Sequence, residues 1–492
     1  MDFQVAWHRY LQEGKRRKGE GEKWSTQRQL HAFLRQSIQT GLLPAGSKLA
    51  SSRNLALELG IARNTVVYAY EQLLSEGFVN ANRQGSVVND IGVMLDKNLV
   101  SHDPDKAVGS LSKRAESLID LPVPAELSGA FAPGIPAVDT FSTLRWRRLL
   151  EQEWRRCTPR DLAYGEACGE TTLRIAIADY LRASRGVICD AEQVFITDGT
   201  QSSLDLCARV FADAGDKVWI ENPGYVGAQL ALKAAQLKMI GIEVDDEGMA
   251  PRAQDWSQHQ PKLIYVTPSH QYPTGKVMSV ARRLDLLRQA KQHQSLIIED
   301  DYDSEFRHEG PPLPAMQGLI SDAPVLYLGT FSKTLFPAIR VAYMIVPQNL
   351  TSALRLHFQR AFLRGRAIEQ KALARFVSEG HFAQHVRRMR RLYRERRDAL
   401  VQALEDYLPE DIEVHGDTAG MHLALRFVEG QHGMRSDLDI SERALRAGLV
   451  VPALSKLAVG RRHSAWRGLM LGYAQIPADQ MRAKVRALVD LF

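Results

Sequence analysis

From about residue 130 to the C-terminus, apolar runs of strand length alternate with amphipathic stretches of helical length. The runs include QVFIT, KVWIE, KLIYVTP, SLIIEDD, VLYLGT and VAYMIVP, and helical candidates such as SSLDLCARVFADA and ARRLDLLRQAKQHQ lie between them. This alternation predicts an α/β fold in which helices cover both faces of a mostly parallel sheet. We also expect a smaller α+β subdomain at the C-terminal end of this large domain.

Three zones divide the 492 residues. Residues 24–90 alternate short helical patterns with turn signals, whereas residues 91–127 are polar, contain several prolines and lack sustained periodicity. The second zone is typical of a linker. Residues 128–492 carry the alternating pattern. We therefore predict a short N-terminal domain joined by a linker to a large one.

The N-terminal zone predicts three helices and a β-hairpin. The first helix spans residues 27–41 and places four apolar residues on one face; they are Leu30, Phe33, Leu34 and Ile38. A second helix, SRNLALEL, follows Ser51 or Ser52 as its N-cap and stops at Gly60. The third runs from about Arg63 to Glu76, and FVNANRQGSVV then offers two short strands. This order is that of a winged helix-turn-helix.

The third helix carries side chains that suit DNA. If Val66, Ala69 and Leu73 are buried, the first turn of the helix and Tyr68 face outward. Arginine pairs with guanine edges or phosphate, asparagine with adenine, and threonine with phosphate. The candidate DNA contacts of the module are Arg53, Arg63, Asn64, Thr65, Tyr68 and, at the hairpin tip, Arg83. Each residue alone is more typical of a solvated polar position.

The segment GTFSKTLFPAIRVAY, residues 329–343, contains a candidate Schiff-base lysine. Lys333 follows a strand that ends in small and hydroxyl residues, and desolvation or nearby positive charge lowers the pKa of such an amine. Arg340 is placed to hold a phosphate with two hydrogen bonds, and Ser332 adds a hydroxyl donor. The alternative is a surface lysine and arginine in a loop.

Three other segments supply matching parts. In IIEDDYDSEF, a buried Asp300 would hold a pyridine nitrogen protonated, and Tyr302 would donate to a phenolic oxygen. A strand meets a helix at Gly199, Thr200 and Gln201, where backbone amides can bind phosphate. Tyr225 can stack on an aromatic ring. Taken singly, an acidic strand end is usually exposed and a tyrosine usually belongs to the core.

Together these motifs resemble known families. The run GLLPAGSKLASSRNLALELGIARNTVVYAYEQLLSEGFV resembles the GntR winged-helix signature, and residues 130–492 resemble fold-type I aminotransferases. The MocR/GabR family, in which a GntR-type head is joined to this fold, is more similar still. The resemblance implies pyridoxal 5′-phosphate (PLP) on Lys333, with Asp300, Tyr302, Tyr225, Arg340, Ser332, Gly199, Thr200 and Gln201 around it.

The resemblance also implies partners. Tyr164 resembles a tyrosine that reaches the phosphate of the neighbouring subunit in a head-to-tail homodimer, and Arg467 resembles the arginine that binds a substrate carboxylate. The chain would be a transcription regulator that binds a double-stranded DNA operator and senses PLP or its adduct with a small amine or amino acid. An active aminotransferase with an accessory DNA-binding head, or a scaffold with an empty PLP site, would share these motifs.

Several positions depart from the family patterns. Ala50 replaces the usual proline, and the wing is short. Tyr272 stands where aminotransferases carry asparagine before Pro-Thr-Gly, which weakens the case for efficient transamination. Gly227 stands where regulators that respond to γ-aminobutyrate carry arginine, so we expect a different effector.

Bulk properties exclude some classes of protein. No apolar run approaches the roughly 20 residues that span a bilayer, so we expect a cytoplasmic protein without a membrane partner. The four cysteines, at positions 157, 168, 189 and 207, lack zinc spacing, and we expect no metal site. A net charge of +6 permits a polyanionic partner without requiring one. The basic run at residues 387–397 is more typical of a solvated or inter-subunit helix face than of a DNA contact.

Overall fold

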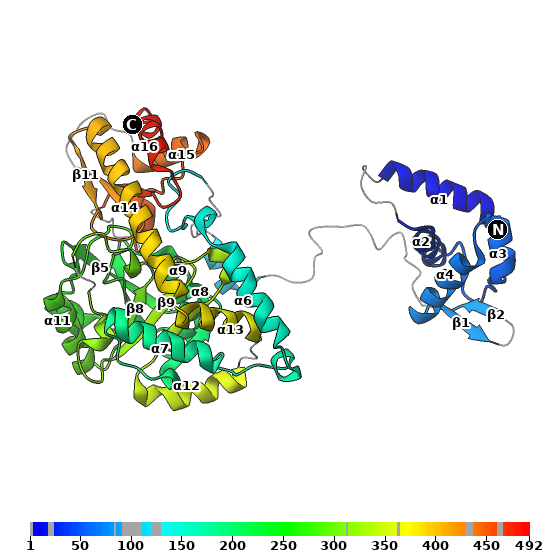
Figure 1. The fold of residues 1–492 in the computed structure, drawn as a ribbon, viewed down its shortest axis with the longest axis horizontal. Helices are drawn as coiled ribbons and strands as arrows, with labels where there is room; N and C mark the ends of the chain where they lie inside the picture. The colour runs from blue at the N-terminus through cyan, green and yellow to red at the C-terminus, as the bar shows by residue number, and fades with distance from the viewer. Residues whose placement is uncertain are drawn as a thin grey trace. The chain divides into compact units, whose positions relative to one another are not determined.

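The computed structural model describes residues 3–17, 24–82, 85–90, 111–119, 129–310, 313–361, 365–428, 436–459 and 466–492. The chain divides into two compact units, residues 1–110 and 111–492 (Figure 1). No helix in these described ranges is long and apolar enough to cross a membrane.

The N-terminal unit contains the predicted winged helix-turn-helix. Its helices are α2 (Thr26–Gln39), α3 (Ser52–Leu59) and α4 (Arg63–Ser75), and the antiparallel hairpin pairs β1 (Val79–Asn82) with β2 (Gly85–Val88). The Ser51 hydroxyl caps α3 by accepting from the Asn54 amide at 3.2 Å, and Gly60 ends the helix at φ +65°. The predicted apolar face of α2 is buried together with Val66, Ala69 and Leu73 of α4.

A further helix, α1 (Phe3–Arg17), extends this unit beyond the predicted start at residue 24. Its Trp7 is only 3% exposed, and the indole ring lies 5.3 Å from the ring of Phe33 on α2. Tyr10 packs against the same phenylalanine at 5.4 Å. Because residues 3, 7 and 10 recur at helical spacing, α1 presents one apolar face to the head. The first residues of the chain therefore belong to the core of the N-terminal unit.

The large unit is built on an eight-stranded sheet of order β3-β10-β9-β8-β7-β4-β5-β6. The strands are β3 (Val194–Thr197), β4 (Lys217–Asn222), β5 (Lys238–Asp245), β6 (Gly248–Met249), β7 (Leu263–Val266), β8 (Leu296–Asp301), β9 (Val325–Thr330) and β10 (Ala342–Ile345). The central strands from β5 to β9 pair in parallel, as predicted. Strand β10 pairs antiparallel with both of its neighbours. The β9–β10 connection carries Lys333 and contains no crossover helix.

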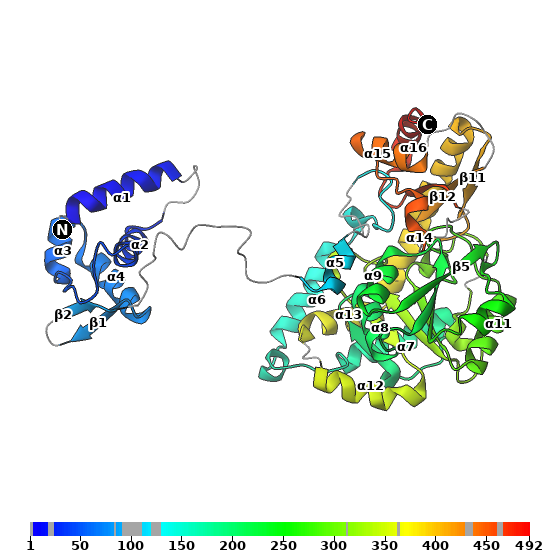
Figure 2. The ribbon, with the colours of Figure 1, turned by 180° about the vertical axis from the view of Figure 1, so that it is seen from behind.

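Helices cover this sheet (Figures 1 and 2). Those that contact strands include α7 (Thr171–Arg185), α8 (Thr200–Val210), α9 (Val226–Ala234) and α11 (Val280–Gln292). Helices α6 (Thr143–Arg155) and α13 (Ala367–Ser378) pack together, and α13 also lies on α7. The remaining helices of this part are α10 (Ala253–Gln258) and α12 (Gln348–Ala361).

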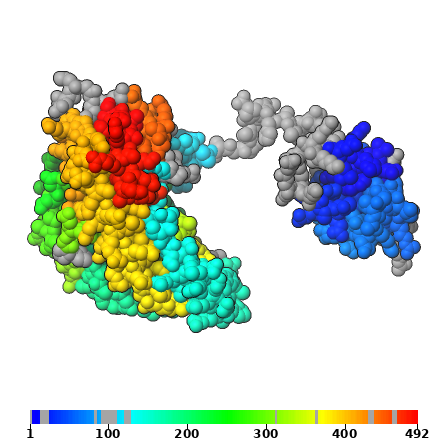
Figure 3. Space-filling model, turned by 45° about the horizontal axis from the view of Figure 1, so that its top comes forward, coloured from blue at the N-terminus to red at the C-terminus, as the bar shows by residue number. Residues whose placement is uncertain are grey.

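A smaller three-stranded antiparallel sheet, β11 (Ile412–His415), β12 (His422–Phe427) and β13 (Gly468–Gly472), forms the predicted C-terminal subdomain. The long helix α14 (His381–Tyr407) packs against α16 (Ala478–Val489), and the two lie side by side in yellow and red in Figure 3. Helix α15 (Asp437–Arg446) completes the subdomain. The basic run falls on α14, where Arg388 and Arg390 donate to the carbonyls of Thr140 and Glu305 within the large unit.

The described part of the predicted linker contains a helix, α5 (Lys113–Ile119), that packs on α9 (Figure 2). The ammonium of Lys233, on α9, donates to the carbonyl of Ser117. Leu118 faces a cavity of about 350 Å³ that residues of α8 and α9 also line. The compact large unit thus begins within the stretch predicted as a linker, whose residues 91–110 and 120–127 lie outside the described ranges.

Candidate cofactor site and DNA-binding face

A cavity of about 350 Å³ opens at the carboxyl ends of the central parallel strands. Side chains that follow β4, β7, β8 and β9 line it, among them Tyr225, Thr267, Asp300 and Lys333. Ligands of open α/β sheets bind at this edge because the loops that leave parallel strands meet there. Residues 132–135 and residues of the C-terminal part of the chain also line it; the latter are Met421, His422, Val450 and Pro452.

Lys333 places its amine inside this cavity. The Nζ atom donates to the carbonyl of Gly134 at 2.6 Å. Burial lowers the pKa of Lys333, and the positive charge of Arg340 acts in the same direction, whereas Asp303 and Asp300 oppose it. A lowered pKa increases the neutral fraction of the amine, which is the form that attacks an aldehyde.

Asp300 lies at the end of β8 and is 4% exposed. Its Oδ2 accepts a hydrogen bond from the Tyr265 hydroxyl at 2.8 Å, while no described residue donates to its buried Oδ1. Burial raises the pKa of Asp300 to about 7. A buried carboxylate oxygen with no donor is costly, and a protonated ring nitrogen in the cavity would pair with it.

A cradle for an anion lies where β3 leads into α8. Gly199 caps α8 at φ +104°, and a Cβ built on it would fall 2.6–2.9 Å from the guanidinium of Arg340. Arg340 itself donates to the Asp198 carbonyl at 2.7 Å. Thr200 lines the cavity at the first turn of α8, and the buried Ser332 hydroxyl has no hydrogen-bond partner among the described residues. Helix amides, a guanidinium and a hydroxyl together suit a phosphate group.

Aromatic rings form one wall of the cavity. Tyr225 stands at the N-cap of α9 with its ring 5.3 Å from that of Tyr272, and the two rings meet edge to face. Tyr272 meets Tyr302 in the same way at 6.2 Å. Burial raises the pKa of Tyr225 to about 12, so its phenol stays protonated at neutral pH. The wall offers apolar ring faces and hydroxyl donors to a flat ligand.

Gly199, Ser332 and Arg340 form the cradle beside Thr200 without lining the cavity itself, and three further predicted residues lie outside both. The side-chain amide of Gln201 donates to the Gly227 carbonyl at 3.0 Å, and Gln201 lines the neighbouring cavity that Leu118 faces. Tyr164 is 79% exposed, outside the cavity of its own subunit. Arg467 is exposed and precedes β13 at the end opposite to Gly472, which pairs with His422 of the cavity wall. Five residues of strand separate them by about 16 Å, and the structure does not place Arg467 at the site.

Sequence reasoning missed a buried polar cluster beside the cavity. His270, Asp303 and His422 come within 4.8 Å of one another through their potential ligand atoms. His270 Nδ1 lies 3.0 Å from Asp303 Oδ2, and His422 Nε2 lies 3.2 Å from the Pro273 carbonyl. Asp303 falls inside the motif IIEDDYDSEF, and His270 lies two residues before the Tyr272 that precedes Pro-Thr-Gly. These segments were the available signal for the cluster in the sequence. Their spacing does not show that the side chains of His270 and Asp303 lie within hydrogen-bond distance of each other.

The N-terminal unit exposes most of its predicted DNA contacts. Arg53, Arg63 and Asn64 are exposed at the starts of α3 and α4, and Tyr68 is half-buried. The Arg63 Nε donates to the Ser52 hydroxyl at 3.3 Å, which links the two helices. Thr65 is a correction, because it lies 8% exposed on the face of α4 that also buries Val66. Arg83 lies outside the described residues.

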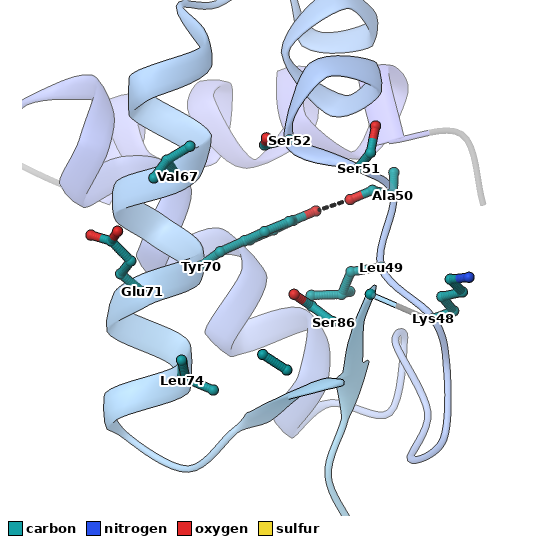
Figure 4. Close-up of a pocket in the computed structure, with 12 residues that line it drawn as sticks. Lys48, Leu49, Ala50, Ser51, Ser52, Val67, Tyr70, Glu71, Leu74 and Ser86 are labelled. Atoms are coloured by element: carbon teal, nitrogen blue, oxygen red, sulfur yellow. Dashed lines mark hydrogen bonds between the residues drawn. The ribbon is translucent and has the colours of Figure 1, made fainter. Parts of the chain in front are cut away.

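A cleft of about 500 Å³ lies beside α4, between this helix and the wing (Figure 4). Tyr70 crosses the cleft and donates its hydroxyl proton to the Ala50 carbonyl at 2.9 Å (Figure 4). This bond holds the segment before α3 against helix α4. Ala50 therefore contributes its backbone carbonyl to this contact.

Two separate regions of the chain match models of known protein families. Residues 26–88 match the bacterial regulatory proteins of the gntR family, and residues 142–466 match aminotransferase class I and II. Among solved structures, a multiple substrate aminotransferase from Thermococcus profundus shares 28% identity at a TM-score of 0.67, with 78% of this chain and 95% of that chain covered. The large unit therefore has the fold of PLP-dependent aminotransferases.

Full-length relatives are regulators. The probable rhizopine catabolism regulatory protein MocR of Rhizobium meliloti is 38% identical over 94% of this chain and 93% of its own length. The pyridoxine biosynthesis transcriptional regulator PdxR of Corynebacterium glutamicum is 32% identical over 95% of this chain and 96% of its own. The molecule is thus a winged-helix regulator with an aminotransferase-like domain. It belongs to the MocR/GabR family of transcription regulators.

The Gly199 cradle yields a steric prediction. We expect Gly199→Ala to weaken binding of PLP by at least about tenfold, because the new methyl group would displace the Arg340 guanidinium. Gly215→Ala is the matched control, since Gly215 has a similar φ of +94° but nothing within 4 Å of the added Cβ. Absorbance titration with PLP measures both affinities. Equal losses in the two variants would mean that backbone strain alone is responsible.

Proposed function

We propose that this regulator holds PLP on Lys333 and changes its affinity for operator DNA when PLP, or PLP joined to a small amine, occupies the cavity. The observation that carries the proposal is the presence, in one cavity, of a half-buried lysine amine and a buried carboxylate oxygen that has no described donor. PLP presents an aldehyde to the first and a ring nitrogen to the second, and its phosphate suits the Gly199 cradle. The residues present fit the cofactor of the fold.

Each side chain has a defined task toward bound PLP. When bound, PLP supplies an electron-withdrawing ring to an attached amine. Asp300 keeps the ring nitrogen protonated, Tyr225 stacks on the ring, and Tyr302 donates to its phenolic oxygen. Arg340, Ser332 and the first turn of α8 at Gly199 and Thr200 hold the phosphate, with Gln201 contributing through its backbone.

Helix α5 supports a route from the cavity to the linker. Helix α8 begins at the phosphate cradle and α9 begins at Tyr225, so both have one end in the site. The same two helices line the cavity that Leu118 of α5 faces, and Lys233 of α9 holds the Ser117 carbonyl. A ligand that shifts α8 or α9 therefore changes the surface on which the end of the linker rests. Coupling requires that the ligand bind one arrangement better than the other.

The proposed assembly is a head-to-tail homodimer that presents two heads to paired half-sites of an operator. The 79% exposure of Tyr164 supports this, because its hydroxyl is available to the phosphate site of a second subunit. In each head, Arg53, Arg63, Asn64 and Tyr68 would contact DNA.

The effector is proposed to be an amine other than γ-aminobutyrate. A Cβ at Gly227 would lie 2.5 Å from the Tyr225 ring, so a larger residue there would displace the stacking tyrosine. The lysine and carboxylate of the site also support a second candidate activity, residual transamination. Among the described residues that line the cavity, Lys333 is the only lysine or arginine, and this favours regulation over turnover of amino acids.

The attachment of PLP is tested by chemical trapping. We expect borohydride reduction of the PLP-treated protein to leave a pyridoxyl group on the peptide that contains Lys333, as measured by mass spectrometry. Lys333→Ala should lose both this mass and the visible absorbance band. A pyridoxyl group on another lysine, with Lys333 unmodified, would contradict the proposal.

The role of α5 is tested by undocking it. We expect Leu118→Asp to keep the PLP absorbance band but to reduce the effect of PLP on operator affinity from at least about fivefold to less than about twofold. Ile119→Asp is the control, because the neighbouring Ile119 is 67% exposed. Fluorescence anisotropy with labelled operator DNA measures both. If PLP changes the operator affinity of Leu118→Asp as much as that of the wild type, α5 has no role in the coupling.

DNA recognition is tested on α4. We expect Arg63→Ala to weaken operator binding by about 1–3 kcal/mol if the guanidinium reads a base, with less loss on non-specific DNA. Thr65→Val keeps the shape of the side chain and removes its hydroxyl, and it should leave operator affinity within about twofold because Thr65 faces the core. A large loss in Thr65→Val would return this residue to the DNA-contacting set.

A further inference from the structure

We propose that His270, held in place by Asp303, is a positioning residue that fixes the hydroxyl of Tyr302 against the cofactor. The proposal rests on PLP binding at Lys333, as proposed above. Tyr302 and Asp303 line the cavity, and His270 lies behind them. His270 therefore acts on the ligand only through the tyrosine.

The hydrogen bonds around Tyr302 define the arrangement. Its hydroxyl lies 2.9 Å from the His270 carbonyl oxygen, to which it donates, and 3.2 Å from the ring Nδ1 of the same residue. Asp303 Oδ2 lies 3.0 Å from that Nδ1 and is an acceptor for its proton. With Nδ1–H donating to the carboxylate, the Nδ1 lone pair is not available to the phenol. The phenol proton is then shared between the His270 carbonyl and an acceptor in the cavity.

Close packing leaves the imidazole one position. A Cβ built on Gly420 would lie 2.0 Å from Cε1 and 2.1 Å from Nδ1 of His270, and 2.7 Å from Asp303 Oδ2. The Gly420 carbonyl accepts from the Tyr473 hydroxyl at 2.6 Å, which holds this glycine at φ +83°. On another side, the His422 ring lies 4.6 Å from the His270 ring. Both side chains of the His270–Asp303 pair are at most 1% exposed.

No other contact of the His270–Asp303 pair among the described residues explains why these positions carry ionisable groups. No described residue bonds to Nε2 of His270, although that atom is buried. A buried imidazole that merely filled space would not need a carboxylate at 3.0 Å, and burying both groups is costly. Their combined effect is to set where the Tyr302 oxygen lies and which acceptor its proton faces. A donor at the phenolic oxygen of PLP stabilises the negative charge on that oxygen and so lowers the pH at which the linkage to Lys333 loses its proton.

The experiment is a pH titration of the visible absorbance of the full-length protein loaded with PLP. We expect Tyr302→Phe to raise the pH midpoint by about one unit, equivalent to a tenfold change in the proton equilibrium. His270→Asn and His270→Gln should raise it in the same direction by a smaller amount, and Asp303 is left unchanged because its negative charge acts directly on Lys333. His293→Asn, at the C-cap of α11 and stacked on Trp256, is the control and should not move it.

A double-mutant cycle separates positioning from a general loss of structure. If His270 acts through Tyr302, the Tyr302→Phe/His270→Asn variant should have the same midpoint as Tyr302→Phe alone. Additive shifts, or an unchanged midpoint in both His270→Asn and His270→Gln, would overturn the inference. If His270→Asn does not fold, His270→Gln with Tyr302→Phe completes the same cycle. Failure of the wild-type protein to form a visible band would instead refute the proposed cofactor.

Discussion

A carboxylate buried without a full set of donors is the constraint around which the large unit is arranged. Asp300 and Asp301 are neighbours on β8, and strand alternation sends their side chains to opposite faces of the sheet. Asp301 is paired within the protein, since Arg185 donates to its Oδ2 at 2.8 Å. Asp300 receives only the Tyr265 hydroxyl and directs its other oxygen into a cavity shared with Lys333. Asp301 thus has an internal cationic partner, although its Oδ1 also accepts no hydrogen bond from a described residue, whereas Asp300 has no such partner among these residues and lies in the cavity.

The other parts of the site follow from the sheet that carries Asp300. Parallel strands bring the ends of β4, β7, β8 and β9 to one edge, so residues that lie far apart in sequence meet around one ligand-sized space. The helices that leave this edge, α8 and α9, extend from the site to the surface where α5 packs. Helices α8 and α9 thus lie between the cavity that contains Lys333 and helix α5. This arrangement suits a regulator, because a small displacement at the start of α8 or α9 changes the contacts that the helix makes along its length.

The sequence was most informative where local patterns reflect local forces. The 3.6-residue periodicity predicted the buried faces of α2 and α4, and strand-length apolar runs predicted the parallel core. The motifs also predicted that Lys333, Asp300, Tyr225 and Gly199 lie around one ligand site. Failures came where tertiary packing decides the outcome. Thr65 is polar but lies on the buried stripe of its helix, and Arg467 precedes a strand whose opposite end, not its own, reaches the cavity.

The features that the sequence did not predict need contacts between distant segments. The apolar face of helix α1 does not by itself show that Trp7 packs on Phe33 of the head, and α5 is too short and polar to be distinguished from linker. The His270–Asp303 pair joins residues 33 positions apart, and its tight packing depends on Gly420 from a third segment.

The most direct test compares operator affinity of the full-length protein with and without PLP, in the wild type and in Lys333→Ala. The account predicts that PLP changes the operator Kd of the wild type by at least about fivefold, and that the Kd of Lys333→Ala does not respond to PLP. An equal response in the two proteins would contradict the claim that the site at Lys333 controls DNA binding. So would a wild-type Kd that is the same with saturating PLP as without it.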